Sequence, residues 1–304
     1  TLNGIYNAQG DSRTPLIFLI ISSLTNIVLD LLFVIQFNMG VAGVAWATLI
    51  AQGMCAIASL VVMFQRMKKL PCEPERANMK IPLFHMTAVK RIAQIGLPSM
   101  LQQSLVSLSM MMMQGLVNSF GKVLVAGYTA ATKIDTLAML PNMNFSNAMS
   151  SYTAQNIGAG KHDRVDAILR YAIGIGLTFG LIVAVAVQFI APSVVRPFTS
   201  DEAVVLAGAS YIRGYIFDCL FAGVQFSFSG YFCACGRSGL SFLHNFLSIV
   251  LARVPGAYLA CKRFPNTLYP MGLASAAGSL LSIIICVIAY AALMRREKKS
   301  LQGG

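Results

Sequence analysis

The sequence predicts an all-α bundle of membrane-spanning helices, and three observations support this. Its 304 residues are 56% hydrophobic and only 11% charged, and the mean hydropathy is +0.68. A water-soluble domain carries about 25% charged residues. The apolar residues also form runs of about 20 or more, the length that a helix needs to cross a hydrocarbon core of about 30 Å. We therefore expect a polytopic (multi-pass) membrane protein.

About eight apolar runs are long enough to span the membrane. The predicted spans are 14–36, 42–65, 92–120, 123–152, 171–195, 203–232, 238–261 and 268–294. The ionisable side chains inside them are Asp30, Lys133, Asp135, Arg213, Asp218 and Arg253. Because a charge in the hydrocarbon core is costly, these six residues are the first candidates for function.

The basic residues between the spans predict the orientation, since cytoplasmic loops carry an excess of Lys and Arg. Sixteen basic residues fall on the side of Arg13, including seven from Arg66 to Arg91 and four in the C-terminal tail, against four on the other side. We expect a bacterial inner-membrane protein with the Arg13 side and the C-terminus in the cytoplasm. The polar stretch 70–91, on that side, reads as a linker between two lobes. Because Thr1 already lies at what reads as a helix end, we also expect a piece of a longer protein.

Several function classes are disfavoured. The net charge of +12 does not indicate nucleic-acid binding, because the basic residues lie in the connections. The three histidines are scattered, and no Gly-rich phosphate-binding loop of the type that ends in Lys-Ser or Lys-Thr occurs, so we expect no enzyme. Cys233 and Cys235 have no second pair or nearby histidine, so packing is favoured over a metal centre. We expect no cofactor.

Asn26 and Asp30 are the first candidate site. They are four residues apart, so they share one face of the predicted helix. A carboxylate and an amide oxygen suit a hard cation, and a carboxylate in a low dielectric can also take up a proton. Thr48, on the next helix, could add a hydroxyl. The residues suggest an H+ or Na+ coupling role for Asp30, with a structural hydrogen-bond anchor as the alternative.

The second half of the chain contains further candidates. Lys133 and Asp135 do not face each other on a helix, and neither do Arg213 and Asp218, so each needs its own partner or water. With Arg253, these residues predict either a polar transport cavity or a structural network of ion pairs.

The predicted span 92–120 carries Gln102, Gln103 and the run Met110–Met113. Flexible thioethers suit ligands of varied shape. Four consecutive residues point all around a helix, however, so at most two can face one cavity. We take Gln102, Gln103 and Met111 as candidates for the cavity, with core or lipid-facing methionine as the alternative.

Five motifs resemble, in sequence and order, those of the multidrug and toxic-compound extrusion (MATE) exporters. They are GDSRTP at 10–15, NIVLD at 26–30, GVAGVAWAT at 40–48, IGLPS at 95–99 and QNIGAGK at 155–161. The resemblance implies the two-lobed fold of the MATE and flippase superfamily, with twelve helices in two lobes of six. Residues 1–69 would then be the C-terminal part of the N lobe, from the end of helix four through helix six, and 92–304 the C lobe with helices seven to twelve and a basic tail.

The resemblance also implies site residues. In prokaryotic members an Asn and an Asp on helix five and a Thr on helix six line a cation site, and these match Asn26, Asp30 and Thr48. In the subgroup with acidic residues on helices seven and ten, the helix-seven acid has no counterpart, because Gln102, Gln103 and their neighbours are neutral. Asp218 lies on the helix-ten counterpart, about one turn from the family's position.

The expected function is secondary active transport: a monomer in the lipid bilayer in which H+ or Na+ drives the export of amphiphilic or cationic small molecules. A flippase for a lipid-linked oligosaccharide is the alternative within the superfamily. A non-transporting membrane receptor or assembly protein is the alternative outside it.

Overall fold

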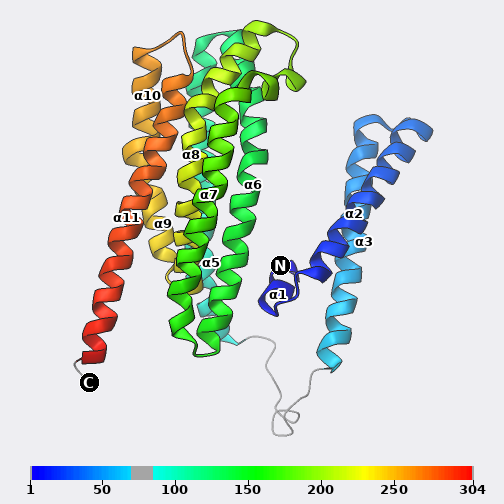
Figure 1. The fold of residues 1–304 in the computed structure, drawn as a ribbon. Helices are drawn as coiled ribbons and strands as arrows, with labels where there is room; N and C mark the ends of the chain where they lie inside the picture. Colours follow the sequence, from blue (N-terminus) through cyan, green and yellow to red (C-terminus); the bar gives the residue numbers. More distant parts are fainter. Residues whose placement is uncertain (1, 70–84, 303–304) are drawn as a thin grey trace. The chain divides into compact units, whose positions relative to one another are not determined.

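The computed structural model describes residues 2–69 and 85–302, and these contain helices and short connections but no strand. The chain forms two compact units, Thr1–His85 and Met86–Gly304, and each is described by itself (Figure 1).

The first unit is built around a helical hairpin. Its elements are α1 (Leu2–Ala8), α2 (Arg13–Leu31), the π-helix η1 (Leu32–Gln36) and α3 (Gly40–Lys69). The chain reverses between η1 and α3 through Asn38 and Gly40, whose φ angles are 51° and 54°. This left-handed conformation favours Asn and Gly. The hydroxyl of Tyr6 donates a hydrogen bond of 2.7 Å to the carbonyl of Ser59, which ties α1 to α3.

Asp11 closes one end of this hairpin. Its carboxylate accepts the backbone N–H groups of Arg13 and Thr14 at 3.0 and 3.1 Å, so it caps α2. The guanidinium of Arg66, near the end of α3, pairs with Asp11 and donates to the Thr14 hydroxyl at 2.8 Å. The hydroxyl of Thr14, the guanidinium of Arg66 and the Thr14 N–H all hold the pKa of Asp11 well below its usual value. The motif at 10–15 therefore serves as a cap and a helix-to-helix tie.

The second unit is a bundle of long helices. Its elements are α5 (Met86–Val117), η2 (Asn118–Phe120), α6 (Lys122–Gly158), α7 (His162–Val195), η3 (Arg196–Phe198), α8 (Glu202–Ala234), α9 (Ser238–Ser248), the π-helix η4 (Ile249–Arg253), α10 (Val254–Arg263) and α11 (Tyr269–Gln302). The last three elements before α11 follow one another without a break, so they form one span with a π-helical turn in its middle.

Helix α8 is the centre of this bundle, packed between α6, α7 and α11 (Figure 1). Glycines let the backbones approach closely: a Cβ added to Gly223 would lie 2.7 Å from the backbone of Gly176 in α7, and one added to Gly127 in α6 would lie 2.8 Å from Gly208. Small residues at contact points are how membrane helices pack tightly, because lipid supplies no hydrophobic driving force between them.

The predicted spans are helical, with different bounds. In the part of the chain that the structure describes, seven helices are long and apolar enough to cross a membrane: Arg13–Gln36, Gly40–Lys68, Lys122–Gly158, Asp163–Phe198, Glu202–Ala234, Ser238–Arg263 and Tyr269–Arg295. The remaining predicted span, 92–120, corresponds to α5. This helix has 32 residues but contains four glutamines and two basic residues, so its composition alone does not identify it as a membrane span.

The predicted linker at 70–91 lies mostly outside the described residues. Its last part differs from the prediction, because residues 86–91 form the first turns of α5 rather than a connection. Beyond Pro82 this stretch contains no proline or glycine, so nothing in it prevents helix formation.

Candidate functional sites

The first candidate site lies within the helical hairpin. The side-chain amide of Asn26 in α2 donates a hydrogen bond of 3.3 Å to Oγ1 of Thr48 in α3. Thr48 in turn donates its hydroxyl proton to the carbonyl of Val44 at 2.9 Å, so its oxygen is free to accept. The structure thus brings together two of the three residues predicted for this site.

Asp30 lies one turn further along α2 and is half-buried. Its Oδ1 is shielded from solvent and has no hydrogen-bond partner among the described residues. A buried carboxylate oxygen without a donor is costly unless a proton or cation neutralises it. The π-helix η1 begins two residues later, and such segments recur at functional sites because they leave the regular helical hydrogen-bond pattern.

The chemistry of this group is that of a site for a proton or a small hard cation. The carboxylate of Asp30, the hydroxyl oxygen of Thr48 and the amide oxygen of Asn26 are oxygen donors, which Na+ prefers to nitrogen. Asn26 uses its N–H₂ group on Thr48, which leaves its carbonyl oxygen available.

The second candidate site is a cavity of about 210 Å³ inside the second unit. It is lined by side chains of α5, α6, α8, η4 and α11: Ser109, Met110, Met113, Gln114, Tyr128, Thr132, Asp135, Thr136, Tyr211, Tyr215, Arg253 and Ser275. Of the predicted cavity residues, Asp135 lies here. The hydroxyls of Thr132 and Thr136 donate to backbone carbonyls of α6, so their oxygens can accept from a ligand.

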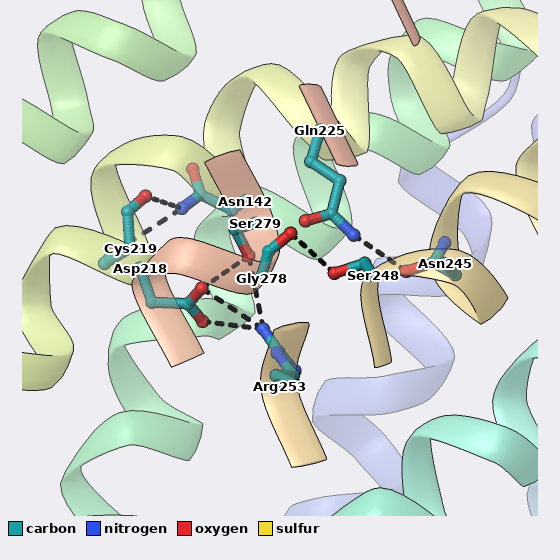
Figure 2. A network of polar contacts seen from close by, with 9 residues as sticks. All are labelled: Asn142, Asp218, Cys219, Gln225, Asn245, Ser248, Arg253, Gly278 and Ser279. Atoms are coloured by element: carbon teal, nitrogen blue, oxygen red, sulfur yellow. Dashed lines mark hydrogen bonds and ion pairs between the residues drawn. The ribbon is translucent and has the colours of Figure 1, made fainter. Parts of the chain in front are cut away.

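Asp218 is only 1% exposed and is paired rather than open to this cavity. Nη2 of Arg253 lies 3.1 Å from its Oδ1 and 3.0 Å from its Oδ2, and the hydroxyl of Ser279 in α11 donates to Oδ1 (Figure 2). The five ionisable residues named inside the predicted spans of this half therefore differ in their surroundings. Asp218 and Arg253 form a closed internal pair, whereas Asp135 faces a cavity and Lys133 is exposed.

The two predicted glutamines lie at a different cavity, of about 240 Å³, between α5, α6 and α8. Oε1 of Gln102 accepts a hydrogen bond of 2.9 Å from the Ser241 hydroxyl, so this side chain joins α5 to α9. Gln103 also lines this cavity. Met111 lines neither cavity and is 72% exposed, whereas Met110 and Met113 line the cavity of Asp135. The helical phase, which sequence spacing alone did not orient, decides which methionine faces inward.

Polar side chains continue along the buried face of α8. The amide of Gln225 donates to Oδ1 of Asn245 at 2.7 Å, and the Ser248 hydroxyl donates to the carbonyl of Gly278 at 2.5 Å (Figure 2). The amide of Asn142, which follows Pro141 in α6, donates to the carbonyl of Cys219 at 3.4 Å. The interior of the second unit is therefore held by hydrogen bonds from four of its helices.

Sequence reasoning missed two members of this interior. Arg253 was identified as a charge in a predicted span but not as the partner of Asp218, and Ser279 was not identified at all. The signal for Arg253 was the balance of charges, because a buried carboxylate is stabilised by a buried basic side chain. Ser279 gave no signal, since serine is common throughout these helices.

These observations define the class of the molecule. Long apolar helices joined by short connections, with acidic side chains such as Asp135 and Asp218 inside the bundle, are the architecture of a helical multi-pass membrane transporter.

Comparison with known proteins identifies the family. The MatE family model matches residues 98–259, more than half of the chain, and the chain belongs to this family of multidrug efflux transporters. A relative in Bacillus subtilis, named as the multidrug resistance protein YpnP, is 31% identical over 254 residues, which are 84% of this chain and 56% of the relative. The multidrug resistance protein NorM of Thermotoga maritima is 23% identical over 266 residues, 86% of this chain and 56% of NorM.

Solved structures agree in fold. A crystal structure of a variant of the Vibrio cholerae MATE transporter VcmN matches with a TM-score of 0.87 at 20% identity, over 97% of this chain and 65% of VcmN. An outward-facing multidrug resistance MATE family transporter matches with a TM-score of 0.85 at 23% identity, over 98% of this chain and 66% of that protein. The chain thus spans about half the length of the curated relatives it matches and about two thirds of these structures.

Proposed function

We propose that the protein carrying this chain is a secondary active exporter, in which H+ or Na+ binds at Asp30, Asn26 and Thr48 and drives the outward movement of amphiphilic or cationic small molecules. It works as a monomer in the bilayer and needs no prosthetic group. The observation that carries the proposal is the shielded, unpartnered Oδ1 of Asp30, one turn from the Asn26 to Thr48 hydrogen bond.

The coupling follows from charge. In a low dielectric, an unneutralised Asp30 is unstable, so its state depends on whether a cation is bound. An ion can drive a conformational change only if it binds the two states with different affinity. Each monovalent cation that moves down a potential of 100 mV supplies about 2.3 kcal/mol, which sustains a gradient of roughly 50-fold for an uncharged substrate exchanged one for one. One-for-one exchange with a monocationic substrate moves no net charge, so the concentration gradient of the coupling ion drives it.

The cargo class rests on relatives. YpnP and NorM are named for multidrug resistance, and the Staphylococcus aureus relative MepA is named a multidrug export protein. A relative in Shewanella oneidensis, 24% identical over 260 residues, is named an FAD transporter, so an anionic dinucleotide is the cargo to test second.

The orientation follows from the basic connections. The bacterial inner membrane, with the inter-lobe linker and the C-terminus in the cytoplasm, is the arrangement that the distribution of Lys and Arg favours.

The test is ethidium efflux from energised cells, with wild type and Asp30→Asn compared at equal membrane expression. We expect loss of efflux in Asp30→Asn, because asparagine can neither take up a proton nor neutralise Na+. The matched control is Asp163→Asn, which removes an exposed carboxylate in the first turn of α7 and should leave efflux unchanged. Efflux with Asp30→Asn equal to wild type would reduce Asp30 to a structural anchor.

The alternatives make different predictions in the same cells. No efflux from wild type with several cationic dyes, but export of FAD, would replace the drug cargo with a dinucleotide. No transport of either, with movement of a lipid-linked oligosaccharide between leaflets, would indicate a flippase. No transport of any of the three would indicate a receptor or assembly protein.

A further inference from the structure

Arg253 sits on Asp218 where a mobile cation would sit. Its Nη2 is nearly equidistant from the two carboxylate oxygens, at 3.1 and 3.0 Å, and lies 3.2 Å from Oγ of Ser279. Ser279 also donates to Oδ1 of Asp218. Asp218 therefore accepts three hydrogen bonds and is only 1% exposed, so its carboxylate is closed to solvent.

Two features of the backbone position the side chain of Arg253 beside Asp218. It is the last residue of the π-helix η4, and the wider turn shifts its direction relative to a regular helix. On α11, Gly278 makes room for the side chain: a Cβ at Gly278 would lie 2.9 Å from Cγ of Arg253 (Figure 2 shows both residues). The placement of the guanidinium thus depends on backbone geometry in two helices.

The charges of this region balance at Asp218 but not at Asp135. Arg253 is the one basic residue among those that line the adjacent cavity, and its Nη2 is committed to Asp218. The other titratable groups of the region are Asp135 and Tyr128 from α6, with Tyr211, Tyr215 and Cys219 from α8. Among the described residues here, Asp135 is the carboxylate without a basic partner in contact.

We propose that Arg253 is a tethered cation that takes the place of an exchangeable ion at Asp218. The second unit then binds neither H+ nor Na+ at Asp218 as long as the pair is closed, and Arg253 determines this exclusion. A covalently attached charge cannot be released on the other side of the membrane. Compared with a unit in which Asp218 had no basic partner, this unit can therefore exchange one ion fewer. The carboxylate of Asp218 is nevertheless paired.

The experiment measures cation-dependent thermal stability of the purified full-length protein in detergent. The midpoint of unfolding, Tm, is compared in NaCl and in choline chloride at equal ionic strength, and at mildly acidic and mildly alkaline pH. Arg253→Gln should gain a Na+-dependent or proton-dependent rise in Tm, of about 2–5 °C at a cation concentration ten times the dissociation constant. The NaCl arm and the pH arm distinguish the two ions.

Matched variants assign the gain to Asp218. Adding Asp218→Asn to Arg253→Gln should abolish it, whereas adding Asp135→Asn should not. Arg253→Lys, which keeps the tethered charge, should behave as wild type. A folded Arg253→Gln protein without any new cation dependence would overturn the proposal.

A second measurement does not depend on the folding of an Arg253 variant. In a protein with Asp30→Asn and Asp135→Asn together, and with Arg253 intact, we expect no Na+-dependent change in Tm. A remaining change that is lost when Asp218→Asn is added would place an exchangeable cation at Asp218 and contradict the proposal. Since Asp30 is already removed in this protein, the outcome does not depend on whether Asp30 couples transport.

Discussion

The side-chain amide of Asn26 donates to the hydroxyl oxygen of Thr48 at 3.3 Å, and this bond joins α2 to α3 one turn before Asp30. It fixes the direction of both side chains beside a carboxylate oxygen that has no donor of its own among the described residues. The ion site that we propose is therefore positioned by a contact between two helices, and its parts can be changed one at a time.

Thr48→Val should weaken coupling because valine keeps the shape of threonine but removes the oxygen. Loss of one hydrogen bond or ligand of this type costs about 1 kcal/mol, so we expect about a fivefold loss of apparent affinity for the coupling ion. The measurement is the dependence of ethidium efflux on Na+ concentration and pH. Thr48→Ser, which retains the hydroxyl, should remain close to wild type, and equal behaviour of the two variants would exclude the oxygen as a ligand.

Gly223→Ala should destabilise the second unit, because its Cβ would lie 2.7 Å from the backbone of Gly176. Forcing these helices apart costs about 1–3 kcal/mol, and a fall in Tm in detergent of several degrees should follow. The matched control is Gly174→Ala in α7, where nothing lies within 4 Å of the added Cβ. If both variants lowered Tm equally, close packing of α7 on α8 would not be the cause.

Gln225 and Asn245 should show a measurable coupling energy. Hydrogen bonds within membrane bundles average about 0.6 kcal/mol and reach about 1.7 kcal/mol, and this one is short, at 2.7 Å, and buried. A double-mutant cycle with Gln225→Leu and Asn245→Leu, followed by thermal unfolding, should give a coupling in the upper half of that range. Additive effects of the two changes would mean that the bond contributes nothing to stability.

Asp11 should stabilise the hairpin in a pH-dependent way. Its pKa is lowered in the folded protein from the usual value of 3.8, first by the Thr14 hydroxyl and then by Arg66, so the ionised form is the one that the fold stabilises. The contribution is present above the unfolded pKa and is lost as the pH falls toward the folded pKa. The difference in Tm between wild type and Asp11→Asn should be constant from about pH 5 to pH 8 and shrink below about pH 4. It should also shrink in high salt, since the pair with Arg66 is partly exposed. A difference that grows on acidification would contradict this reading.

How much of the site could be predicted depends on the residue. Asn26 and Asp30 share a helix face by spacing alone, so their proximity was predictable, and Thr48 came from the resemblance and its place on the next helix. Asp135 was predictable as an interior charge. Its cavity was not predictable, because it is lined by residues of five elements that lie far apart in the sequence. Met111 shows the limit: the cluster was visible in the sequence, but its rotation about the helix axis was not, and Met110 and Met113 face the cavity instead.

The sequence by itself determined the class of this protein, because 56% hydrophobic residues arranged in runs of membrane-spanning length leave no soluble fold that could bury them. It also determined the repertoire of interior charges. Only the tertiary structure decided which of those charges meet. Arg253 and Asp218 are 35 residues apart and come from different helices. Their contact depends on a π-helical turn and on the space at Gly278. Neither feature produces a repeating pattern in the sequence, so neither could be predicted from it.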